Sequence, residues 1–552
     1  MNAIKENLKK EISIIKEYIE NIVNNKNFYI PLIIFSIISY GFSLFNRTLF
    51  LDDLAQDVYY GSFNHKLKAM RWGQWVGDRL FSTIEFTPFV NKFIGLIFLV
   101  LTVIVIGSIL YYFDNRKDNV WKYSLFSCIF FTYPLISEYF GFFEALTIPL
   151  QFLIVSFVLL YEVVVEKSTF KEILFEGFLL SFVMSGYESL IFVYITEVFI
   201  VLFIKYVLNN NNKSKTSDWI KEGFSYAIPL FVALALKYII GYSILLITGL
   251  SYAQDGNTSI HWITDGFMPT LIRFIFNGYF YVLRGLSFLP ITEFVVATII
   301  FVILVIKHQK QSKHSLLIGF FILLSLFALS LLNGDYLGYR QTQSIQLFIA
   351  YVIYLLFDEL DTKKIFNISV ETILIVLVCF ISLRQSICMH TFLALDNQRS
   401  DNERYIAQTI GYKIYSEFDK NKTVVFSGLY DMGEFINSQI YPSEDSLGGK
   451  IEEYLKDNYG YGNVNVPYTQ NDNVFSVFNW AYYPFYGQTM YGRMLSYYGF
   501  DVKVNENMTY DEVKNYTKIA EDNNMKPFEI RDMGSYILVY LGPATEYTNW
   551  YS

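Results

Sequence analysis

Long apolar segments recur through the first 385 residues of the chain, and they limit the folds that it can adopt. About 20 consecutive apolar residues let an α-helix cross the hydrocarbon core of a membrane. Eleven segments reach or approach this length, at residues 28–50, 89–113, 121–137, 144–165, 172–186, 188–208, 224–249, 291–306, 315–332, 343–357 and 365–384. Because lipid offers the backbone no hydrogen-bond partners, each segment must satisfy its own by forming a helix. The sequence therefore predicts a polytopic α-helical membrane protein with about eleven transmembrane helices.

The composition agrees with this class. Only 17% of the residues are charged, against about 25% in soluble domains, and 53% are apolar. The net charge is −8 and no basic stripe stands out, so no nucleic acid is expected as a partner. The cysteines Cys128, Cys379 and Cys388 form no CxxC pair, which indicates neither a zinc site nor a disulfide framework. No cofactor is predicted, and a divalent ion, if bound, would use carboxylates of the outer loops.

Lysine and arginine fall in alternate loops between the apolar segments, and this pattern sets the orientation. Cytoplasmic loops of membrane proteins carry the excess of these residues. With the N-terminus in the cytoplasm, every inside loop holds at least two of them, at residues 115–122, 166–171, 209–221, 307–313 and 358–364. The first apolar segment is too long for a signal peptide, so we expect a retained helix. The prediction is a multi-pass plasma-membrane protein with its C-terminal domain outside.

Two regions flank the membrane domain. The predicted domains are a cytoplasmic amphipathic helix at 1–27, the transmembrane domain at 28–385 with an outer loop at 52–88, and an extracytoplasmic α/β domain at 386–552. The last rests on strand-like runs at 423–427 and 536–541 and a helical stretch at 510–523. Its ring-rich segment Phe475–Tyr498 could stack on sugars, fill a hydrophobic core or form a face that docks on the membrane.

Two adjacent carboxylates, Asp52 and Asp53, follow the first apolar segment. Charges near lipid are costly to place unless something uses them. A carboxylate here could act as a general base and take the proton from an attacking hydroxyl. The alternative is that the pair merely caps the next helix. The residues alone do not choose between Asp52 and Asp53 as the base.

An interfacial helix is predicted over residues 68–86, shortly after the acids. Trp72, Trp75 and Arg79 are spaced to share one face of it, and Arg71 lies at its start. Tryptophan and arginine suit the headgroup level of a membrane. Because the guanidinium fork binds phosphate well, Arg71 and Arg79 are candidate ligands of a lipid-linked phosphate.

Further polar residues lie at the predicted outer ends of the apolar segments. Arg340 enters a short segment, where a cation needs a partner such as a phosphate or a carboxylate, and Arg284 lies in the outer segment 251–290. Both join the candidate phosphate ligands. The candidates for lining a polar substrate cavity are Glu138, Tyr187, Glu188, Trp72, Trp75 and Lys237. Each of the charged ones could instead be paired for packing.

Together these motifs resemble the glucosyltransferase II family, the serotype-converting membrane enzymes within the GT-C class. The resemblance rests on Leu51-Asp52-Asp53, Trp72…Trp75-Val76-Gly77-Asp78-Arg79, Tyr133-Pro134…Glu138-Tyr139-Phe140, Gly186-Tyr187-Glu188-Ser189, Arg340 and Asp396-Asn397…Asp401…Tyr405. It covers most of the chain, more loosely after about residue 420.

The resemblance implies a GT-C-like architecture with the catalytic acid, Asp52 or Asp53, in the first outer loop and with Arg340 on the donor phosphate. It implies a polyprenyl-phosphate-linked sugar donor, often glucose, and a cell-envelope polysaccharide or teichoic-type polymer as acceptor. Such enzymes usually invert the anomeric centre and need no nucleotide sugar.

Two other functions are consistent with a polytopic chain of this kind. A flippase or exporter of lipid-linked saccharide would share the helices and the polar outer ends, but we find no internal repeat of the kind common in transporters, and the acids gather at one face. A scaffold protein that binds polymer would leave the outer aspartate, arginine and glutamate residues without a use.

Overall fold

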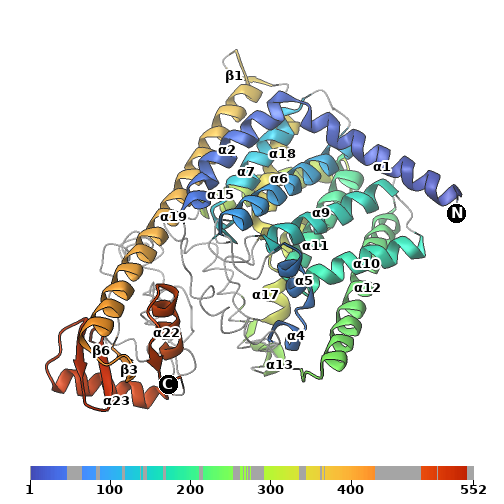
Figure 1. Cartoon of the computed structure of the whole chain (residues 1–552). Helices are drawn as coiled ribbons and strands as arrows, with labels where there is room; N and C mark the ends of the chain where they lie inside the picture. The colour runs from blue at the N-terminus through green and yellow to red at the C-terminus, as the bar shows by residue number, and fades with distance from the viewer. Residues whose placement is uncertain are drawn as a thin grey trace. The chain divides into compact units, whose positions relative to one another are not determined.

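The computed structural model describes residues 2–46, 65–81, 88–114, 119–136, 139–140, 146–165, 169–209, 215–252, 261–264, 266–268, 270–271, 274, 291–334, 343–360, 363–365, 367–428, 487–506 and 508–543. The chain divides into two compact units (Figure 1). Unit 1 comprises Met1–Phe45 and Phe63–Thr391, and unit 2 comprises Asn46–Ser62 and Phe392–Ser552.

Unit 1 is a bundle of helices (Figure 1). Its helices are α1 (Asn2–Val23), α2 (Lys26–Phe45), α4 (His65–Lys68), α5 (Trp72–Phe81), α6 (Pro88–Phe113), α7 (Trp121–Thr132), η1 (Pro134–Ile136), α9 (Thr147–Val165), α10 (Phe170–Met184), α11 (Leu190–Phe203) with the π-helical turn η3 (Ile204–Leu208), α12 (Thr216–Thr248), α13 (His261–Thr264), α15 (Ile291–Gln309), α16 (Ser315–Ser325), α17 (Ala328–Asn333), α18 (Gln343–Leu360) and the first part of α19 (Val370–Glu417). A short hairpin of β1 (Lys364–Ile365) and β2 (Ile368–Ser369) links α18 to α19.

Seven of the described helices are long and apolar enough to cross a membrane. They are Lys26–Phe45, Phe89–Phe113, Thr147–Val165, Leu190–Leu208, Thr216–Thr248, Gln343–Leu360 and Val370–Thr391. The predicted class, a polytopic helical membrane protein, is thus consistent with the helices found. The other four predicted segments are also helical, and they correspond to α7, α10, α15, and α16 with α17. The number of eleven membrane-spanning helices stays a prediction.

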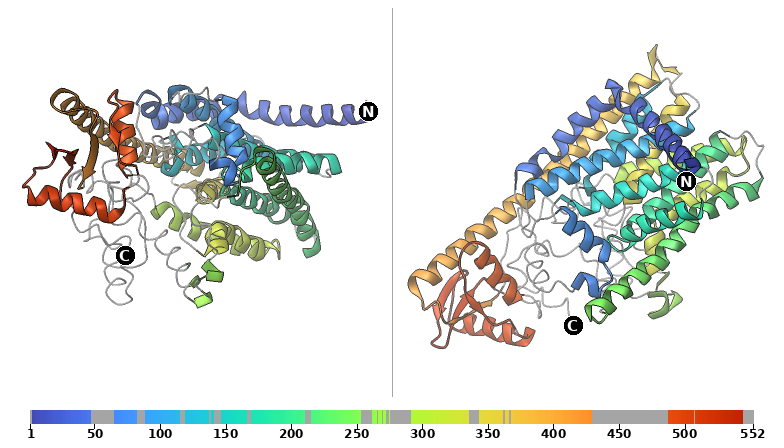
Figure 2. Two further views of the ribbon diagram at one scale, coloured as in Figure 1. Left: turned by 60° about the horizontal axis from the view of Figure 1, so that its bottom comes forward. Right: turned by 45° about the vertical axis from the view of Figure 1, so that its right-hand side comes forward.

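Neighbouring helices of unit 1 pack closely along their lengths. The contacts pair α6 with α9, α7 with α2 and α18, and α10 with α12, as Figure 2 shows from two sides. One glycine allows α10 and α12 to approach closely, because a Cβ atom at Gly177 of α10 would lie 2.4 Å from Cγ1 of Val232 in α12. Such small-residue contacts are the usual way for membrane helices to approach one another.

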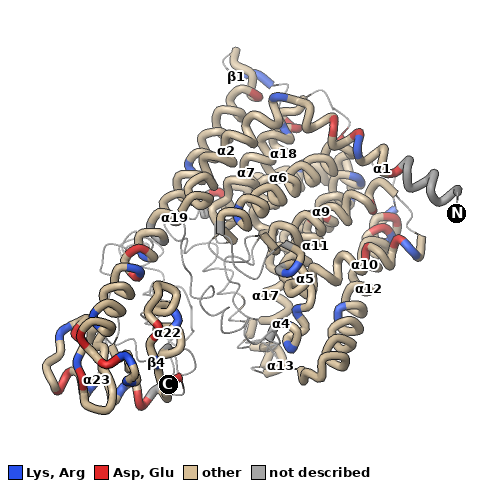
Figure 3. The backbone as a smooth tube through the Cα atoms, viewed as in Figure 1, with Lys and Arg blue, Asp and Glu red and all other residues tan. Residues whose placement is uncertain are grey.

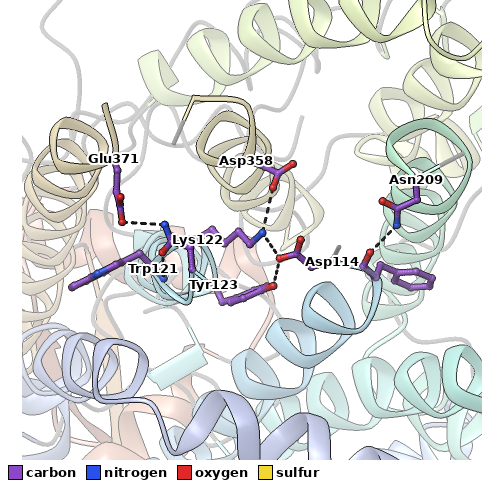
Figure 4. Close-up of polar contacts among 9 residues, drawn as sticks. Asp114, Trp121, Lys122, Tyr123, Asn209, Asp358 and Glu371 are labelled. Atoms are coloured by element: carbon purple, nitrogen blue, oxygen red, sulfur yellow. Dashed lines mark hydrogen bonds and ion pairs between the residues drawn. The ribbon is translucent and has the colours of Figure 1, made fainter. Parts of the chain in front are cut away.

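Ion pairs connect several helices at one end of the bundle (Figure 4). Lys122, at the start of α7, is 1% exposed and forms ion pairs with Asp114 after α6 and with Asp358 near the end of α18, the latter at 3.3 Å. The amide nitrogen of Asn119 donates to a carboxylate oxygen of Glu371, in the first turn of α19, at 3.0 Å. The ends of four helices therefore meet through a buried cation and its neighbours.

Two further hydrogen bonds extend this end of the bundle. Asn209, which follows η3, donates from its side chain to the carbonyl of Phe113 at 2.7 Å, and Ser312 donates to the carbonyl of Tyr206 at 3.0 Å. Helix ends that the charge pattern predicts on one side of the membrane are thus in contact. Figure 3 shows the long helices of unit 1 almost free of charge between such ends. Which side faces the cytoplasm stays a prediction.

Two expected elements differ from the prediction. Within the range 68–86 of the expected interfacial helix the structure has α5, which begins at Trp72 and not at Lys68 because Met70, after the short α4, has a left-handed φ of 58° that stops a helix. Residues 82–86 of this range lie outside the described ones. The last span, expected to end at residue 384, continues without a break through α19 to Glu417. That stretch contains no proline to interrupt it.

Unit 2 contains a four-stranded mixed sheet. Its elements are β3 (Thr423–Ser427), β4 (Lys503–Val504), β5 (Glu529–Asp532), β6 (Tyr536–Tyr540), α22 (Gly487–Tyr497) and α23 (Tyr510–Asp522). The strand order is β4-β3-β6-β5, with β3 parallel to both of its neighbours and β5 antiparallel to β6. The strands and the helix expected at 423–427, 536–541 and 510–523 are therefore present.

The core of unit 2 lies between this sheet and the helices. Ile410 and Ile414 of α19 pack with Phe426 of β3 and with α22 and α23. Tyr491 belongs to the ring-rich segment, is fully buried, and lies 4.7 Å from the ring of Phe426. For this ring the core explanation is correct and the sugar platform is not. The residues 475–486 of the same segment lie outside the described ones.

Candidate active site

The predicted catalytic residues are only partly within the described chain. Asp52, Asp53, Arg284, Arg340 and Glu138 lie outside the described residues, and so does the side chain of Asp78. The described candidates are Arg71, Trp72, Trp75, Arg79, Tyr187, Glu188 and Lys237. They come from α5, from the turn between α10 and α11, and from α12.

The backbone of α5 is fixed to the end of α10. The amide of Gly73 donates to Oγ of Ser185 at 3.0 Å, and the amide of Gln74 donates to the carbonyl of Ser185 at 3.4 Å. These amides belong to the first turn of α5, where no partner exists within the helix. A Cβ atom at Gly73 would lie 2.0 Å from the carbonyl oxygen of Phe182, so no larger residue fits without a shift of the backbone.

Two more glycines complete this attachment. A Cβ atom at Gly77 would lie 2.3 Å from Cγ2 of Thr147 at the start of α9. A Cβ atom at Gly186 would lie 1.8 Å from the amide nitrogen of Gln151, which is buried in the same helix. The helix of the first outer loop, the turn after α10 and the start of α9 therefore form one packed group, which we call the α5 clamp.

Trp72 faces the interior of this group. It is 4% exposed, and its ring lies 6.3 Å from Phe178 and 6.2 Å from Phe182. It belongs to a small hydrophobic cluster with Leu67 and Phe182. Trp72 thus packs α5 against α10, and its role as a cavity wall stays a prediction.

Trp75 and Arg79 share a face of α5, as their spacing predicts. The guanidinium carbon of Arg79 lies 5.6 Å from the centre of the Trp75 ring. Arg79 and Arg71 are both exposed, while Trp75 is half-buried. An exposed guanidinium that stacks on an indole is of the chemical type that binds anions.

The structure brings Glu188 and Lys237 together. They form an ion pair between the turn after α10 and the middle of α12. Lys237 is 12% exposed and Glu188 is 66% exposed, so the pair opens to the surroundings on the side of the glutamate. Next to it, Tyr187 packs edge-on against Tyr139 at 6.1 Å. The pairing alternative is correct for Lys237, and a role in a cavity stays a prediction.

This arrangement lies within the region that a family model matches. The model of the family described as Glucosyl transferase GtrII matches residues 41–357, more than half of the chain. The chain belongs to this family. No curated protein and no solved structure matches it. Family membership confirms the resemblance and supports an enzyme with a glucosyl-transfer role.

The family match covers some parts of the chain and not others. It includes the α5 clamp and the Glu188–Lys237 pair, and it ends in α18. The helix α19 and the sheet of unit 2 follow after the matched residues. Among the described residues, no group of three or more metal-ligating side chains comes together.

One polar cluster among the described residues was not predicted from the sequence. Gln385 of α19 is 1% exposed, its amide nitrogen donates to Oε2 of Glu293 in α15 at 2.5 Å, and its carbonyl oxygen accepts from Thr132 of α7 at 2.6 Å. The signal was present in the sequence, because Glu293 is an ionisable residue inside an apolar segment, where each such residue is a candidate for function.

Proposed function

We propose that the chain transfers glucose from a polyprenyl-phosphate donor to a cell-envelope polysaccharide or teichoic-type polymer on the outer face of the membrane. The observation that carries the proposal is the family match over 41–357, which contains the acidic first outer loop. The α5 clamp supports it, because it fixes α5, a later part of the same predicted loop, which carries Arg79 and begins directly after Arg71.

The proposed reaction needs one base and one group that stabilises the leaving phosphate. Asp52 or Asp53 takes the proton of an acceptor hydroxyl, whose oxygen attacks the anomeric carbon as the bond from that carbon to the phosphate oxygen breaks. A single displacement of this kind inverts the anomeric centre. The products are the glucosylated polymer and polyprenyl phosphate, so no nucleotide sugar or redox partner is required.

The arginines supply the second requirement. Charge grows on the phosphate as it leaves, and a guanidinium at that position stabilises it most where water is excluded. Arg79 on the Trp75 ring and Arg71 at the start of α5 are the described candidates, with Arg284 and Arg340 as further ones. A half-buried indole beside them suits contact with the lipid part of the donor.

The test is glucosyl transfer in membranes that hold the Asp52→Asn, Asp53→Asn and double variants. We expect the double variant to lose transfer by at least about a hundredfold, the range expected for loss of a general base. Asp522→Asn, in the exposed last turn of α23, is the matched control and should leave transfer unchanged. Full activity in the double variant, at equal protein level, would contradict the assignment of the base.

A further inference from the structure

The polar cluster around Gln385 extends to α2, the helix that precedes the acidic loop in the sequence. Next to Gln385, the hydroxyl of Ser386 lies 2.8 Å from that of Ser39 in α2. The helix α2 ends at Phe45, seven residues before Asp52. Glu293 follows the predicted outer segment 251–290 and lies in the first turn of α15. The cluster is therefore close in the chain to both parts of the proposed site.

Glu293 is only half satisfied by its neighbours. Its Oε2 atom accepts from Gln385, whereas Oε1 is buried and accepts no hydrogen bond from any residue that the structure describes. A buried carboxylate oxygen without a donor costs about 1–3 kcal/mol or more. Gln385 cannot turn to meet it, because Thr132 holds the other side of its amide. The hydrogen bonds among Glu293, Gln385 and Thr132 thus fix the position of the Oε1 atom.

A second intramembrane glutamate shows what distinguishes Glu293. Glu197 of α11 is 3% exposed, accepts from Ser156 at 2.8 Å through one oxygen and has no described partner for the other. It lies in the middle of a span, whereas Glu293 lies at a helix start and interacts electrostatically with Arg384, an exposed cation of α19. Of these two glutamates, it is Glu293 that combines an acceptor oxygen without a described partner with an exposed cation nearby.

We propose that Glu293, oriented by Gln385, binds a hydroxyl group of a sugar substrate through Oε1. A carboxylate that accepts from a neutral hydroxyl makes a strong, charge-assisted hydrogen bond, and the amide of Gln385 beside it carries both a donor and an acceptor. This inference deepens the proposed function and rests on it. The sugar is the donor glucose or the terminal unit of the acceptor, which share this chemistry.

The test compares Glu293→Gln with the wild type on substrates that each lack one hydroxyl. We expect Glu293→Gln to reduce kcat/KM with the parent substrates by about ten- to hundredfold. For the wild type, kcat/KM should fall by the same factor when one particular hydroxyl is missing from the substrate. For Glu293→Gln, removal of that hydroxyl should cause no further fall. If that substrate is a deoxyglucosyl donor, the donor sugar is bound; if it is a deoxy acceptor, the acceptor is bound. Glu197→Gln should show no such dependence.

Thr132→Val gives an independent variant, because it removes the hydroxyl that orients Gln385, together with the bond of that hydroxyl to the carbonyl of Cys128 in the same helix. It should weaken recognition of the same hydroxyl by a smaller factor and leave the others unchanged. Equal losses for all deoxy substrates in Glu293→Gln would overturn the inference.

A direct binding measurement separates this inference from the proposed function. Should the wild type transfer no sugar, the proposed function fails. The inference is then tested by binding alone. The measurement is the rise in Tm of the wild type and of Glu293→Gln on addition of polyprenyl-phosphate-glucose, its deoxy analogues or a glucose-terminated acceptor oligosaccharide. A rise that depends on one hydroxyl and on Glu293 supports it, and no such dependence overturns it.

Discussion

Gly73 is the residue at which the backbones of α5 and α10 meet. Replacement by alanine would place a methyl group 2.0 Å from the carbonyl oxygen of Phe182 and displace the hydrogen bond to Ser185. We expect Gly73→Ala to cost about 1–3 kcal/mol of stability, as overpacking does, and to lower transfer because the first outer loop loses its attachment. The measurement is Tm in detergent together with transfer activity.

Gly41→Ala is the matched control for this change. A Cβ atom at Gly41 of α2 meets only Cγ2 of Ile37 at 3.9 Å, an ordinary van der Waals contact. It should leave both Tm and transfer unchanged. If Gly73→Ala behaved like Gly41→Ala, the clamp would have no role in holding the loop.

Lys122 gives a second prediction at this scale. It is buried between Asp114 and Asp358, and its removal takes a shared cation from two carboxylates (Figure 4). We expect Lys122→Met to destabilise the protein by about 3 kcal/mol or more, since breaking a buried pair leaves charge uncompensated. Lys16→Met, whose side chain is 70% exposed, should change Tm little. Equal Tm values for the two variants would show that the buried pair is not stabilising.

At the scale of elements, the edge of the sheet in unit 2 should respond to acid. The ion pair with Lys422 lowers the pKa of Asp532, and the amide of Lys526 and the Arg531 guanidinium lower the pKa of Glu529. The folded pKa values lie below the unfolded ones, so the unfolded state binds more protons and stability falls as pH drops through that window. The loss should begin near the ordinary values of 4.5 and 3.8.

Hydrogen exchange of β5 and β6 in the full chain measures this effect. Protection should fall as the pH is lowered from about 5 to about 3, the range in which these two carboxylates become protonated. Asp532→Asn should show lower protection at neutral pH and a weaker fall. A pH-independent protection in the wild type would contradict the role of these pairs.

The sequence predicted the existence of elements better than their ends. Apolar runs located the helices of unit 1, because hydrophobic length and helix coincide in a membrane. The break at Met70 was not predictable, since methionine has no preference for the left-handed region. The helix α19 is longer than the predicted span, which ended at Arg384. Polar residues such as Arg384 and Gln385 end an apolar run without ending a helix.

The candidate site, too, could be predicted only in part. The shared face of Trp75 and Arg79 followed from helical spacing, and the partner of Lys237 was among the residues already selected. The contact of Glu293 with Gln385 and Thr132 joins three helices that are distant in sequence. No local pattern indicates such a contact, although the lone charge in an apolar segment marked one of its members.

At the scale of the whole molecule, the loop charges predict which surface faces outward. We expect a cysteine in place of Glu506, in unit 2, to react with a membrane-impermeant thiol reagent added to intact cells. A cysteine in place of Lys313, between α15 and α16, should react only after the membrane is opened. The background is a variant with Cys128, Cys379 and Cys388 replaced by alanine. The reverse pattern would invert the proposed orientation.

The central claim is tested most directly with purified protein in liposomes that contain polyprenyl-phosphate-glucose with labelled glucose. With an acceptor polymer added on the side of unit 2, we predict label in the polymer and release of polyprenyl phosphate, with neither in the Asp52→Asn/Asp53→Asn variant. Movement of the labelled lipid between leaflets without transfer to any polymer would contradict the account and indicate a flippase.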